Sequence, residues 1–378
     1  MAPRAWRLAR IAGTEIRIDP SWGIIALLVG YSFYFVVDAV FPASGVGAIL
    51  TVSMLMTVAF FASLLLHELA HAGVARSRGL EVRGITLFLF GGATEADLDA
   101  KEPGDEFWIA VVGPLTSLGI AGALWALVEF GSGVIGDHAA FGAGRLGWLN
   151  LALAVFNLLP GFPLDGGRLV RAAVWASTGD LRRSTDVAVR TGKVIGFLLI
   201  GFGLFELMIG GFIGGLWTAA IGWFLTRAAE SERHRLRLRE TLSGVSVVDV
   251  MQAVPEPVRM STPLGVVVHE HLLRAGAPTV AVRENGNVTG VVTRDSIREI
   301  PRAAWDRRTA GDVMTSLDGL PSLDPGTPVI TAIDVLRDAD GPALVLESGD
   351  VVGTISLKAL SDWIERADAV GLTADGGR

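Results

Sequence analysis

Cysteine is absent from this chain of 378 residues, and charged residues make up only 19% of it. Without cysteine there is no disulfide scaffold, no cysteine-ligated zinc site and no thiol nucleophile, and the redox compartment stays undetermined. Basic residues do not form the uniformly basic face of a nucleic-acid binder, so we expect no nucleic-acid partner. Residues 14–20 are polar or charged where a signal peptide would have its apolar core, so we expect no cleaved signal.

Hydrophobic residues, by contrast, make up 51% of the chain and are concentrated in its first part. Residues 22–226 contain one apolar run after another, whereas the sequence from residue 230 onward has the composition of a soluble domain. A chain of this length is expected to hold two or three domains. The predicted divisions are a membrane domain at 1–228, a charged linker helix at 229–245, and two soluble segments at 246–300 and 301–378.

The apolar runs are long enough to cross a membrane. A helix that spans the bilayer core needs about 20 largely apolar residues, within a range of roughly 17–25. We predict about six crossings and therefore a polytopic α-helical membrane protein in contact with the lipid bilayer. The candidate segments are residues 22–41, 46–74, 107–130, 146–159, 194–209 and 212–225.

Arginine and lysine are unevenly distributed around these segments. If the N-terminus is cytoplasmic, the inner segments hold nearly all of the basic residues, as the positive-inside rule requires. The outer segments at 42–45 and 210–211 hold none, and the one at 131–144 is followed only by Arg145. We therefore expect a multi-pass protein of the cell membrane with both termini and the soluble part in the cytoplasm.

Residues 80–95 (LEVRGITLFLFGGATE) differ from an ordinary loop between crossings. They are rich in β-branched and aromatic residues and carry a glycine pair, Gly91 and Gly92, which predicts strands or a hairpin near the membrane. Non-helical backbone persists at that depth only where it is buried in protein or faces a wet cavity. Residues 15–18 alternate in polarity and are predicted to pair with this segment as a strand.

The soluble part contains an internal repeat. The segment VVDVM at 247–251 recurs as AGDVM at 310–314, and NVTGVVTRDSI at 287–297 recurs as DVVGTISLKAL at 350–360. Each copy is predicted to run strand–helix–strand–strand–helix. The repeat therefore indicates two packed α/β units.

The second apolar segment ends in LLLHELAH at residues 64–71, which contains an H-E-x-x-H motif. On a helix, His67 and His71 point the same way and can hold one ion, while Glu68 lies close enough to act on water there. A wetted helix end near the membrane surface is the alternative. Ionisable residues inside a spanning helix cost about 2.5–3.5 kcal/mol each and usually mark function, which favours a zinc site.

Two histidines leave a catalytic zinc ion one protein ligand short, because such sites usually have three plus water. A candidate lies at the end of the fourth apolar segment, where NLLPGFPLDGGR at 157–168 places Asp165 after two prolines and before two glycines. The same carboxylate could instead cap the following helix. The residues alone leave these two interpretations open.

Together, HELAH, the glycine pair, GPL at 113–115 and NLLPGFPLDGG resemble the site-2 protease family of intramembrane zinc proteases. The matching motifs extend over most of residues 10–228, and the resemblance is to the branch with a C-terminal pair of CBS domains. It implies that Asp165 is the third ligand of one zinc ion per chain. It also implies that Asn157 lines the site and stabilises the oxyanion, and that strands near Gly91 and Gly92 hold the substrate in extended form.

The mechanism expected from this resemblance is hydrolysis of a peptide bond within the bilayer. Zinc activates water and polarises the scissile carbonyl, and Glu68 acts as general base. A transmembrane substrate must unwind, and pairing with a sheet edge replaces its lost hydrogen bonds. The expected substrates are single-pass membrane proteins such as anti-sigma factors, cut in regulated intramembrane proteolysis.

The repeated part resembles a tandem CBS pair, a module that often binds adenine nucleotides and forms homodimers. The family pattern has Thr or Ser on the second strand, which Thr293 and Ser356 match, followed three residues later by an Asp that holds ribose. Position 296 is Ser and position 359 is Ala. Because both copies lack that carboxylate in register, nucleotide binding and a dimerising or gating role both stay open.

Two other functions fit parts of the sequence. A transporter or channel gated by CBS domains would share this architecture, but it would have no need for H-E-x-x-H together with a proline-flanked Asp-Gly. An inactive family member serving as a scaffold is the other alternative. The presence of His67, Glu68, His71 and Asp165 argues against it.

Overall fold

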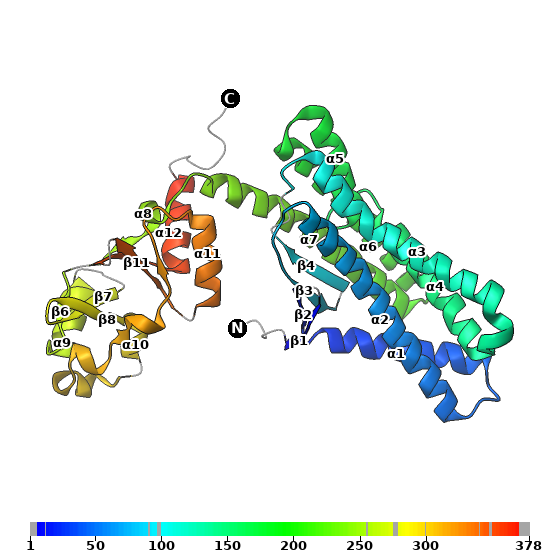
Figure 1. Ribbon diagram of the computed structural model, residues 1–378, viewed down its shortest axis with the longest axis horizontal. Coiled ribbons are helices and arrows are strands. Elements are labelled where there is room, and N and C mark those ends of the chain that lie inside the picture. Colours follow the sequence, from blue (N-terminus) through cyan, green and yellow to red (C-terminus); the bar gives the residue numbers. More distant parts are fainter. Residues whose placement is uncertain are drawn as a thin grey trace. The chain divides into compact units, whose positions relative to one another are not determined.

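The computed structural model describes residues 6–11, 13–89, 91–96, 100–254, 256–274, 279–298, 300–339, 341–347 and 350–369. The chain divides into two compact units, Met1–His234 and Arg235–Arg378. The first contains the long apolar helices, and the second contains the repeated α/β segments (Figure 1). The predicted organisation, a polytopic helical part with a small sheet followed by a CBS-like α/β part, is confirmed.

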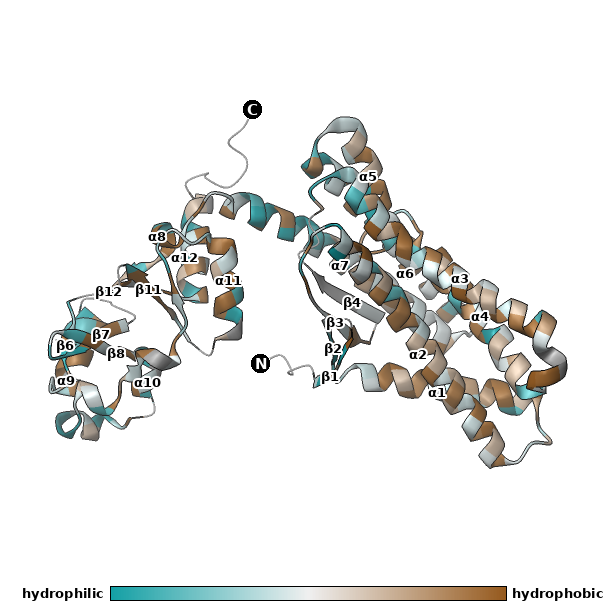
Figure 2. Cartoon of the chain, in the orientation of Figure 1, coloured by the Kyte–Doolittle hydropathy of each residue, from teal (hydrophilic) through white to brown (hydrophobic). Residues whose placement is uncertain are grey.

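Long helices dominate the first unit. Figure 2 shows hydrophobic residues along much of their length, as expected of helices whose solvent is lipid. Their bounds are α1 Trp22–Val40, α2 Val46–Ser77, α3 Pro103–Ile135, α4 Asp137–Asn157, α5 Asp165–Thr178, α6 Leu181–Met208 and α7 Phe212–Leu242.

Within the described part of the chain, five helices are long and apolar enough to cross a membrane: α1, α2, α3, α4 and α6. Five of the six predicted crossings are therefore confirmed as candidates by length and hydropathy. The predicted sixth, residues 212–225, is the apolar first half of α7. The second half of α7 is charged, so this helix is not among the five, and its crossing stays a prediction.

Helices α6 and α7 pack backbone against backbone through glycine. A Cβ added to Gly203 would lie 2.6 Å from the carbonyl oxygen of Gly215, and one added to Gly196 would lie 2.8 Å from that of Gly222. Such close approach is typical of helices that associate in lipid. The packing of α6 against α7 also gives a partner to Glu206, an acidic residue in an apolar segment. The Thr218 hydroxyl of α7 donates a 2.9 Å hydrogen bond to the Glu206 carboxylate.

A small sheet packs beside α2. Its strands, in spatial order, are β1 Trp6–Ile11, β2 Thr14–Ile18, β3 Val82–Phe88 and β4 Gly91–Ala96. The predicted pairing is confirmed, since β2 runs parallel to β3 with Ile16 opposite Ile85. Both of these side chains are fully buried against Ala72 and Ala75 of α2. Strand β1 was not predicted, and its residues are exposed.

Helix α7 is continuous from the apolar segment into the charged sequence. The sequence predicts a separate linker helix at 229–245, whereas one helix covers Phe212–Leu242. Arg233 of α7 forms a 2.9 Å ion pair with Asp186 of α6, and Lys193 of α6 pairs with Glu230 of α7. The charged part of α7 is therefore fastened to α6 before the chain enters the second unit.

The second unit contains two four-stranded sheets in the described residues, ordered β6-β7-β8-β9 and β10-β11-β12-β5. The strands of the first are Val258–Arg259, Thr279–Glu284, Asn287–Thr293 and Thr315–Ser316. Those of the second are Ser322–Leu323, Ala343–Glu347, Asp350–Ile355 and Gln252–Ala253. The helices are α8 Val247–Val250, α9 Leu264–Val266 with the π-helix Val267–Arg274, α10 Arg294–Arg298, α11 Val329–Asp338 and α12 Leu357–Ala369.

Each sheet receives a strand from near the start of the other repeat. Strand β5 lies near the start of the first repeat but pairs with β12, and β9 lies near the start of the second repeat but pairs with β8. The two contacts are equivalent: Gly353 of β12 lies against Met251, and Gly290 of β8 lies against Met314. The repeated VVDVM and AGDVM segments therefore tie the two copies to each other.

Candidate active site

The two histidines of the H-E-x-x-H motif lie on one face of α2. His67 is 2% exposed and His71 is 5% exposed, and their Nε2 atoms are 3.1 Å apart. One helical turn separates them, which brings the two imidazoles to the same point as predicted. Both rings are therefore buried among the helices of the first unit with one nitrogen of each facing the other.

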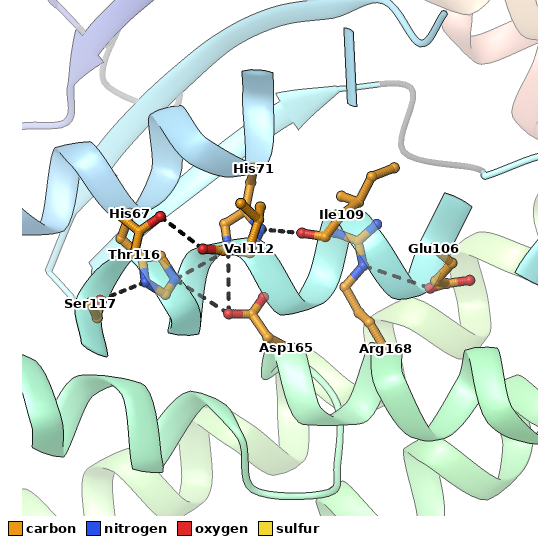
Figure 3. A network of polar contacts seen from close by, with 9 residues as sticks. All are labelled: His67, His71, Glu106, Ile109, Val112, Thr116, Ser117, Asp165 and Arg168. Carbon is orange, nitrogen blue, oxygen red and sulfur yellow. Dashed lines mark hydrogen bonds and ion pairs between the residues drawn. The ribbon is translucent and has the colours of Figure 1, made fainter. Parts of the chain in front are cut away.

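Asp165 meets this pair from another helix. Its Oδ2 atom is 3.3 Å from the Nε2 atoms of both His67 and His71 (Figure 3). Asp165 is the first residue of α5, Leu164 takes the N-cap position, and no side chain caps the helix. The alternative in which the Asp165 carboxylate caps this helix is therefore wrong. The carboxylate faces the histidines instead.

The three facing atoms fit a metal ion. With ligand bonds of about 2.0–2.1 Å, the ligand atoms of a tetrahedral zinc site lie about 3.3–3.4 Å apart, close to the separations seen here. Asp165 Oδ2 is buried and, within the described part of the chain, has no hydrogen-bond partner. A buried carboxylate oxygen without a partner is costly unless an ion or a proton completes its contacts. His67, His71 and Asp165 are accordingly a group able to hold a metal ion.

The other nitrogen of each imidazole is fixed by α3. The Nδ1 atom of His67 is 3.0 Å from the Ser117 hydroxyl, and that of His71 is 2.6 Å from the carbonyl oxygen of Ile109. A histidine that binds a metal usually donates its second N–H in this way, which sets the tautomer and the ring orientation. The contact to a carbonyl, which can only accept, requires the proton of His71 on Nδ1 and leaves Nε2 free to coordinate.

Gly113 gives α3 its close approach to the site. A Cβ at this position would lie 2.1 Å from His71 Nε2 and 2.7 Å from His67 Nε2. Any larger residue would occupy the place where the two imidazoles meet. The glycine of the GPL segment is therefore a requirement of the site's geometry.

Glu68 lies next to strand β4. The position of Gly92 leaves no room for a side chain, since a Cβ there would be 2.6 Å from Glu68 Cγ and 2.9 Å from its Oε1. Glu68 is half-buried, one residue after the first histidine. Gly91, with a φ of 137°, adopts a backbone conformation that favours glycine. The glycine pair thus brings the backbone at the start of β4 against the carboxylate of Glu68.

A tight turn seats the helix that carries Asp165. A Cβ on Gly166 would lie 2.3 Å from the carbonyl oxygen of Leu159, and one on Gly167 would lie 2.3 Å from Phe162 N. Phe162 N in turn donates a 3.1 Å hydrogen bond to the carbonyl of Ala188 on α6. The prolines and glycines of NLLPGFPLDGG therefore fold the chain back on itself and aim the start of α5 at the histidines.

Asn157 is the last residue of α4 and is half-buried. Among the described residues its side chain makes no hydrogen bond. Its expected role at the oxyanion stays a prediction.

Thr293 and Ser356 both act as helix caps. The Thr293 hydroxyl accepts a 3.2 Å hydrogen bond from the amide of Ser296, at the start of α10. The Ser356 hydroxyl accepts one of 3.2 Å from the amide of Ala359, at the start of α12. An N-cap hydroxyl satisfies an otherwise unpaired amide in this manner. Their expected contact with nucleotide stays a prediction, and each has a structural role without it.

One pocket in the second unit has a volume of about 630 Å³. It lies between the π-helix and the 3-10 turn at Arg302–Arg307, so neither Thr293 nor Ser356 lines it. Its walls combine charged and aromatic side chains, among them Val266, His269, Glu270, Arg302, Trp305 and Asp306.

Sequence reasoning missed the residues that support the ligands. Ser117 follows Gly113 by one helical turn, and its small polar side chain in an apolar segment was the available signal. Ile109 contributes only its backbone carbonyl, for which the sequence has no signal. Glu106, described below, lies one turn before Ile109 and just before the third apolar segment at 107–130, and it was not singled out from the sequence.

Comparison with known proteins finds matching family profiles and similar proteins named as zinc metalloproteases. The profile of Peptidase family M50 matches residues 55–146 and 141–199, and the CBS domain profile matches residues 310–366. A Mycobacterium tuberculosis protein named "Putative zinc metalloprotease Rip3" is 36% identical over 359 residues, which cover 92% of this chain and 90% of the relative. A Synechocystis relative, sll0528, also named as a zinc metalloprotease, is 29% identical over 96% of both chains.

Among solved structures, the site-2 protease from Methanocaldococcus jannaschii is similar to the first part of the chain. The match covers 61% of this chain and 95% of that one, at 28% sequence identity and a TM-score of 0.45.

Proposed function

The chain belongs to peptidase family M50 and is a multi-pass zinc metalloprotease of the site-2 type, and we propose that it cleaves transmembrane segments of single-pass membrane proteins. One observation carries the proposal most directly. Asp165 Oδ2, buried and without a hydrogen-bond partner, lies 3.3 Å from each of the two buried imidazoles. We assign His67, His71 and Asp165 as the ligands of one zinc ion.

The bound ion would supply a Lewis acid that activates water near neutral pH and polarises the scissile carbonyl. Glu68 is the general base: it takes a proton from the attacking water and passes it to the leaving amine. Its carboxylate lies one residue from the first ligand and against Gly92, so it is close to both the metal group and the backbone of β4. The carbonyl of Ile109 holds His71 in the tautomer that leaves Nε2 free for the metal, and the Ser117 hydroxyl, 3.0 Å from Nδ1 of His67, orients that ring.

Strand β4 is the substrate-docking edge in this proposal. It is the last strand in the order β1-β2-β3-β4, so one side of it is unpaired within the sheet. A helical substrate must lose its internal hydrogen bonds before a peptide bond can be attacked, and an added strand recovers them at a sheet edge. Gly91 and Gly92 permit the substrate backbone to approach Glu68 without a clash.

The orientation and partners follow from the same proposal. Both termini and the CBS pair lie in the cytoplasm, as the distribution of arginine and lysine indicates. The substrates are single-pass membrane proteins such as anti-sigma factors, cut in regulated intramembrane proteolysis. The CBS pair forms a homodimer, and an adenine nucleotide is its candidate ligand. The capping roles of Thr293 and Ser356 give each hydroxyl a structural function that requires no nucleotide.

The alternative of a CBS-gated transporter or channel has less support. It requires no metal ligands, and the relatives that match this chain over 90% or more of their own lengths are named as zinc metalloproteases.

Reconstitution tests the proposal. The purified protein is placed in lipid vesicles with a tagged single-pass substrate, with and without a zinc chelator and with and without ATP. We expect Glu68→Gln to lower the cleavage rate by about 10²–10⁴-fold, the range for loss of a general base, while bound zinc stays at one ion per chain. Retention of cleavage in Glu68→Gln, or absence of stoichiometric zinc in the wild type, would contradict it. The ATP arm tests only the nucleotide.

A further inference from the structure

One face of α3 contacts every element that bears a candidate ligand. Ser117 and Ile109 fix the two imidazoles, and Gly113 leaves space for them. Glu106 continues the series: the spacing of residues 106, 109, 113 and 117 is that of a single helical stripe. Glu106 contacts α5, the helix that begins with Asp165. Helix α3 therefore holds both histidines directly and Asp165 through α5.

Glu106 forms a buried cluster with two arginines of α5. It is 1% exposed, and its Oε1 accepts a 2.7 Å hydrogen bond from Nε of Arg171 and a second contact from Nη2 of the same residue. Arg168 Nε lies 3.6 Å from the same oxygen (Figure 3). The side chains of Arg168 and Arg171 are 13% and 9% exposed. Three charges are thus withdrawn from solvent between α3 and α5.

Stability alone is a weak reason for such a cluster. Removing ionised groups from water costs several kcal/mol for each ion, and buried ion pairs often stabilise a fold no more than apolar side chains of similar size. Arg168 Nη2 is buried and has no hydrogen-bond partner in the described structure, so the cluster is not even fully satisfied. What a two-pronged guanidinium contact does provide is a defined orientation.

Orientation matters here because Asp165 occupies the first turn of α5. Gly166 and Gly167 seat one side of this turn on the preceding loop, and the arginines of the first two turns anchor it to α3. A side-chain oxygen lies about 6 Å from a helix axis, so a rotation of about 20° would move it by roughly 2 Å. Metal–ligand distances tolerate only about 0.2 Å. The contact of the two arginines with Glu106 therefore restricts the rotation of α5, which is the movement that would carry the Asp165 carboxylate away from the histidines.

We propose that Glu106 is a positioning residue for this protease: through Arg168 and Arg171 it sets the rotation of α5 and so places Asp165 against the histidine pair. The inference rests on the proposed role of Asp165 as a zinc ligand. Glu106 touches neither metal nor substrate.

Zinc affinity of the full-length protein in detergent micelles is the measurement. Metal-free protein competes with a chromogenic chelator of known affinity, and its melting temperature is recorded in parallel to define the folded fraction. The variants are Glu106→Gln, which removes the charge, and Glu106→Asp, which keeps the charge but retracts it by one methylene. Asp105→Asn is the matched control, because Asp105 is the neighbouring residue of the same helix and pairs with Arg78 rather than with α5.

We expect both Glu106 variants to bind zinc about 10- to 100-fold more weakly, the usual effect of removing a group that supports a metal ligand. Asp105→Asn should bind as the wild type does. If the Glu106 variants keep wild-type zinc affinity, or if only the melting temperature of the metal-free protein falls, the role of Glu106 is refuted. Should removal of Glu106 prevent folding, Arg171→Lys weakens the same contact from α5 with the charge retained and is judged by the same criterion.

Asp165→Asn separates this inference from the proposed function. If Asp165→Asn binds zinc as tightly as the wild type, the ligand set itself fails, whatever Glu106 does. If Asp165→Asn loses zinc while the Glu106 variants retain it, the ligand set stands and only the positioning role of Glu106 fails.

Discussion

The two units of this protein use polar groups in opposite ways. In the first unit, the polar groups of the candidate site form one cluster that occurs once: two buried imidazoles, one carboxylate and the groups on α3 that contact them. In the second unit, polar features occur twice at equivalent positions, as with the capping hydroxyls of Thr293 and Ser356. A polar motif that occurs in both repeats is explained first by the fold that the repeats share. A buried polar cluster that occurs once in an apolar unit calls for a functional explanation.

The capping boxes give the same lesson in more detail. Asp249 accepts hydrogen bonds from the amide and hydroxyl of Ser246, and Asp312 does so from Thr309. These are the aspartates of the repeated VVDVM and AGDVM segments. Their duplication reflects the start of two equivalent helical turns and is unrelated to catalysis.

The largest effect should come from filling the space at the metal site. Gly113→Ala places a methyl group 2.1 Å from His71 Nε2, and the imidazole can escape only by leaving its position. We expect zinc affinity to fall by about 100-fold or more, at or beyond the upper end for changes around metal ligands. Chelator competition on the purified protein measures this.

Gly119→Ala provides the matched control for that variant. Gly119 lies on the same helix, and a Cβ there has no atom within 4 Å. Equal zinc affinities for Gly113→Ala and Gly119→Ala would show that α3 does not shape the metal site. The contrast drawn above between the two units would then fail.

A smaller effect is expected from the repeated caps. Thr293→Ala and Ser356→Ala should each destabilise the second unit by about 1 kcal/mol, within the range of roughly 0.5–2 kcal/mol for loss of an N-cap, because each leaves a helix amide unpaired. Urea unfolding in micelles, followed by tryptophan fluorescence, gives the change. Trp305 and Trp363 pack against the cores of the first and second repeats and report on each.

Zinc affinity and cleavage should be unaffected by these cap variants. A loss of ATP binding in Thr293→Ala or Ser356→Ala at unchanged stability would contradict a purely structural role and favour a nucleotide site. If Thr293→Ala and Ser356→Ala lower the free energy of unfolding by clearly different amounts, the two caps are not equivalent, contrary to the comparison above.

The smallest effect should appear in acid. The hydrogen bonds from the amide and hydroxyl of Ser246 hold the pKa of Asp249 below its ordinary value of 3.8, and Thr309 does the same for the pKa of Asp312. A carboxyl group whose pKa is lowered by folding stabilises the fold above its unfolded pKa, and this contribution is lost as the pH falls through the folded pKa. The second unit should therefore weaken below about pH 4, near the unfolded value for Asp.

Unfolding midpoints between pH 7 and pH 3 test this dependence. Asp249→Asn and Asp312→Asn should each flatten the acidic part of the curve by a similar amount. An unchanged curve in both variants would show that the capping boxes do not contribute.

Much of the architecture could be predicted from the sequence because it depends on local pattern. The apolar segments, the strand pairing of residues 15–18 with 80–95 and the repeat were all recognisable from composition and spacing. The sixth crossing stays a prediction, since the apolar part of α7 is short and the helix runs on into charged sequence. Strand β1 was missed because its residues alternate weakly and are exposed.

The site was half predictable for a physical reason. His67 and His71 are one turn apart on one helix, so their convergence follows from helical geometry alone. Asp165 could equally have been a helix cap, and only the packing of the loop at Gly161–Gly167 against α6 and of α5 against α3 decided its direction.

By itself, the sequence determined which segments enter the membrane, that two histidines share a helical face, and that the C-terminal part is duplicated, because each depends on periodicity along a short stretch of chain. Only the tertiary structure decided that Asp165 faces those histidines, that one stripe of α3 contacts both histidines and the arginines of α5, and that each sheet of the second unit takes a strand from near the start of the other repeat. Contacts between segments distant in the chain have no periodic signal, since they depend on how whole helices and strands pack.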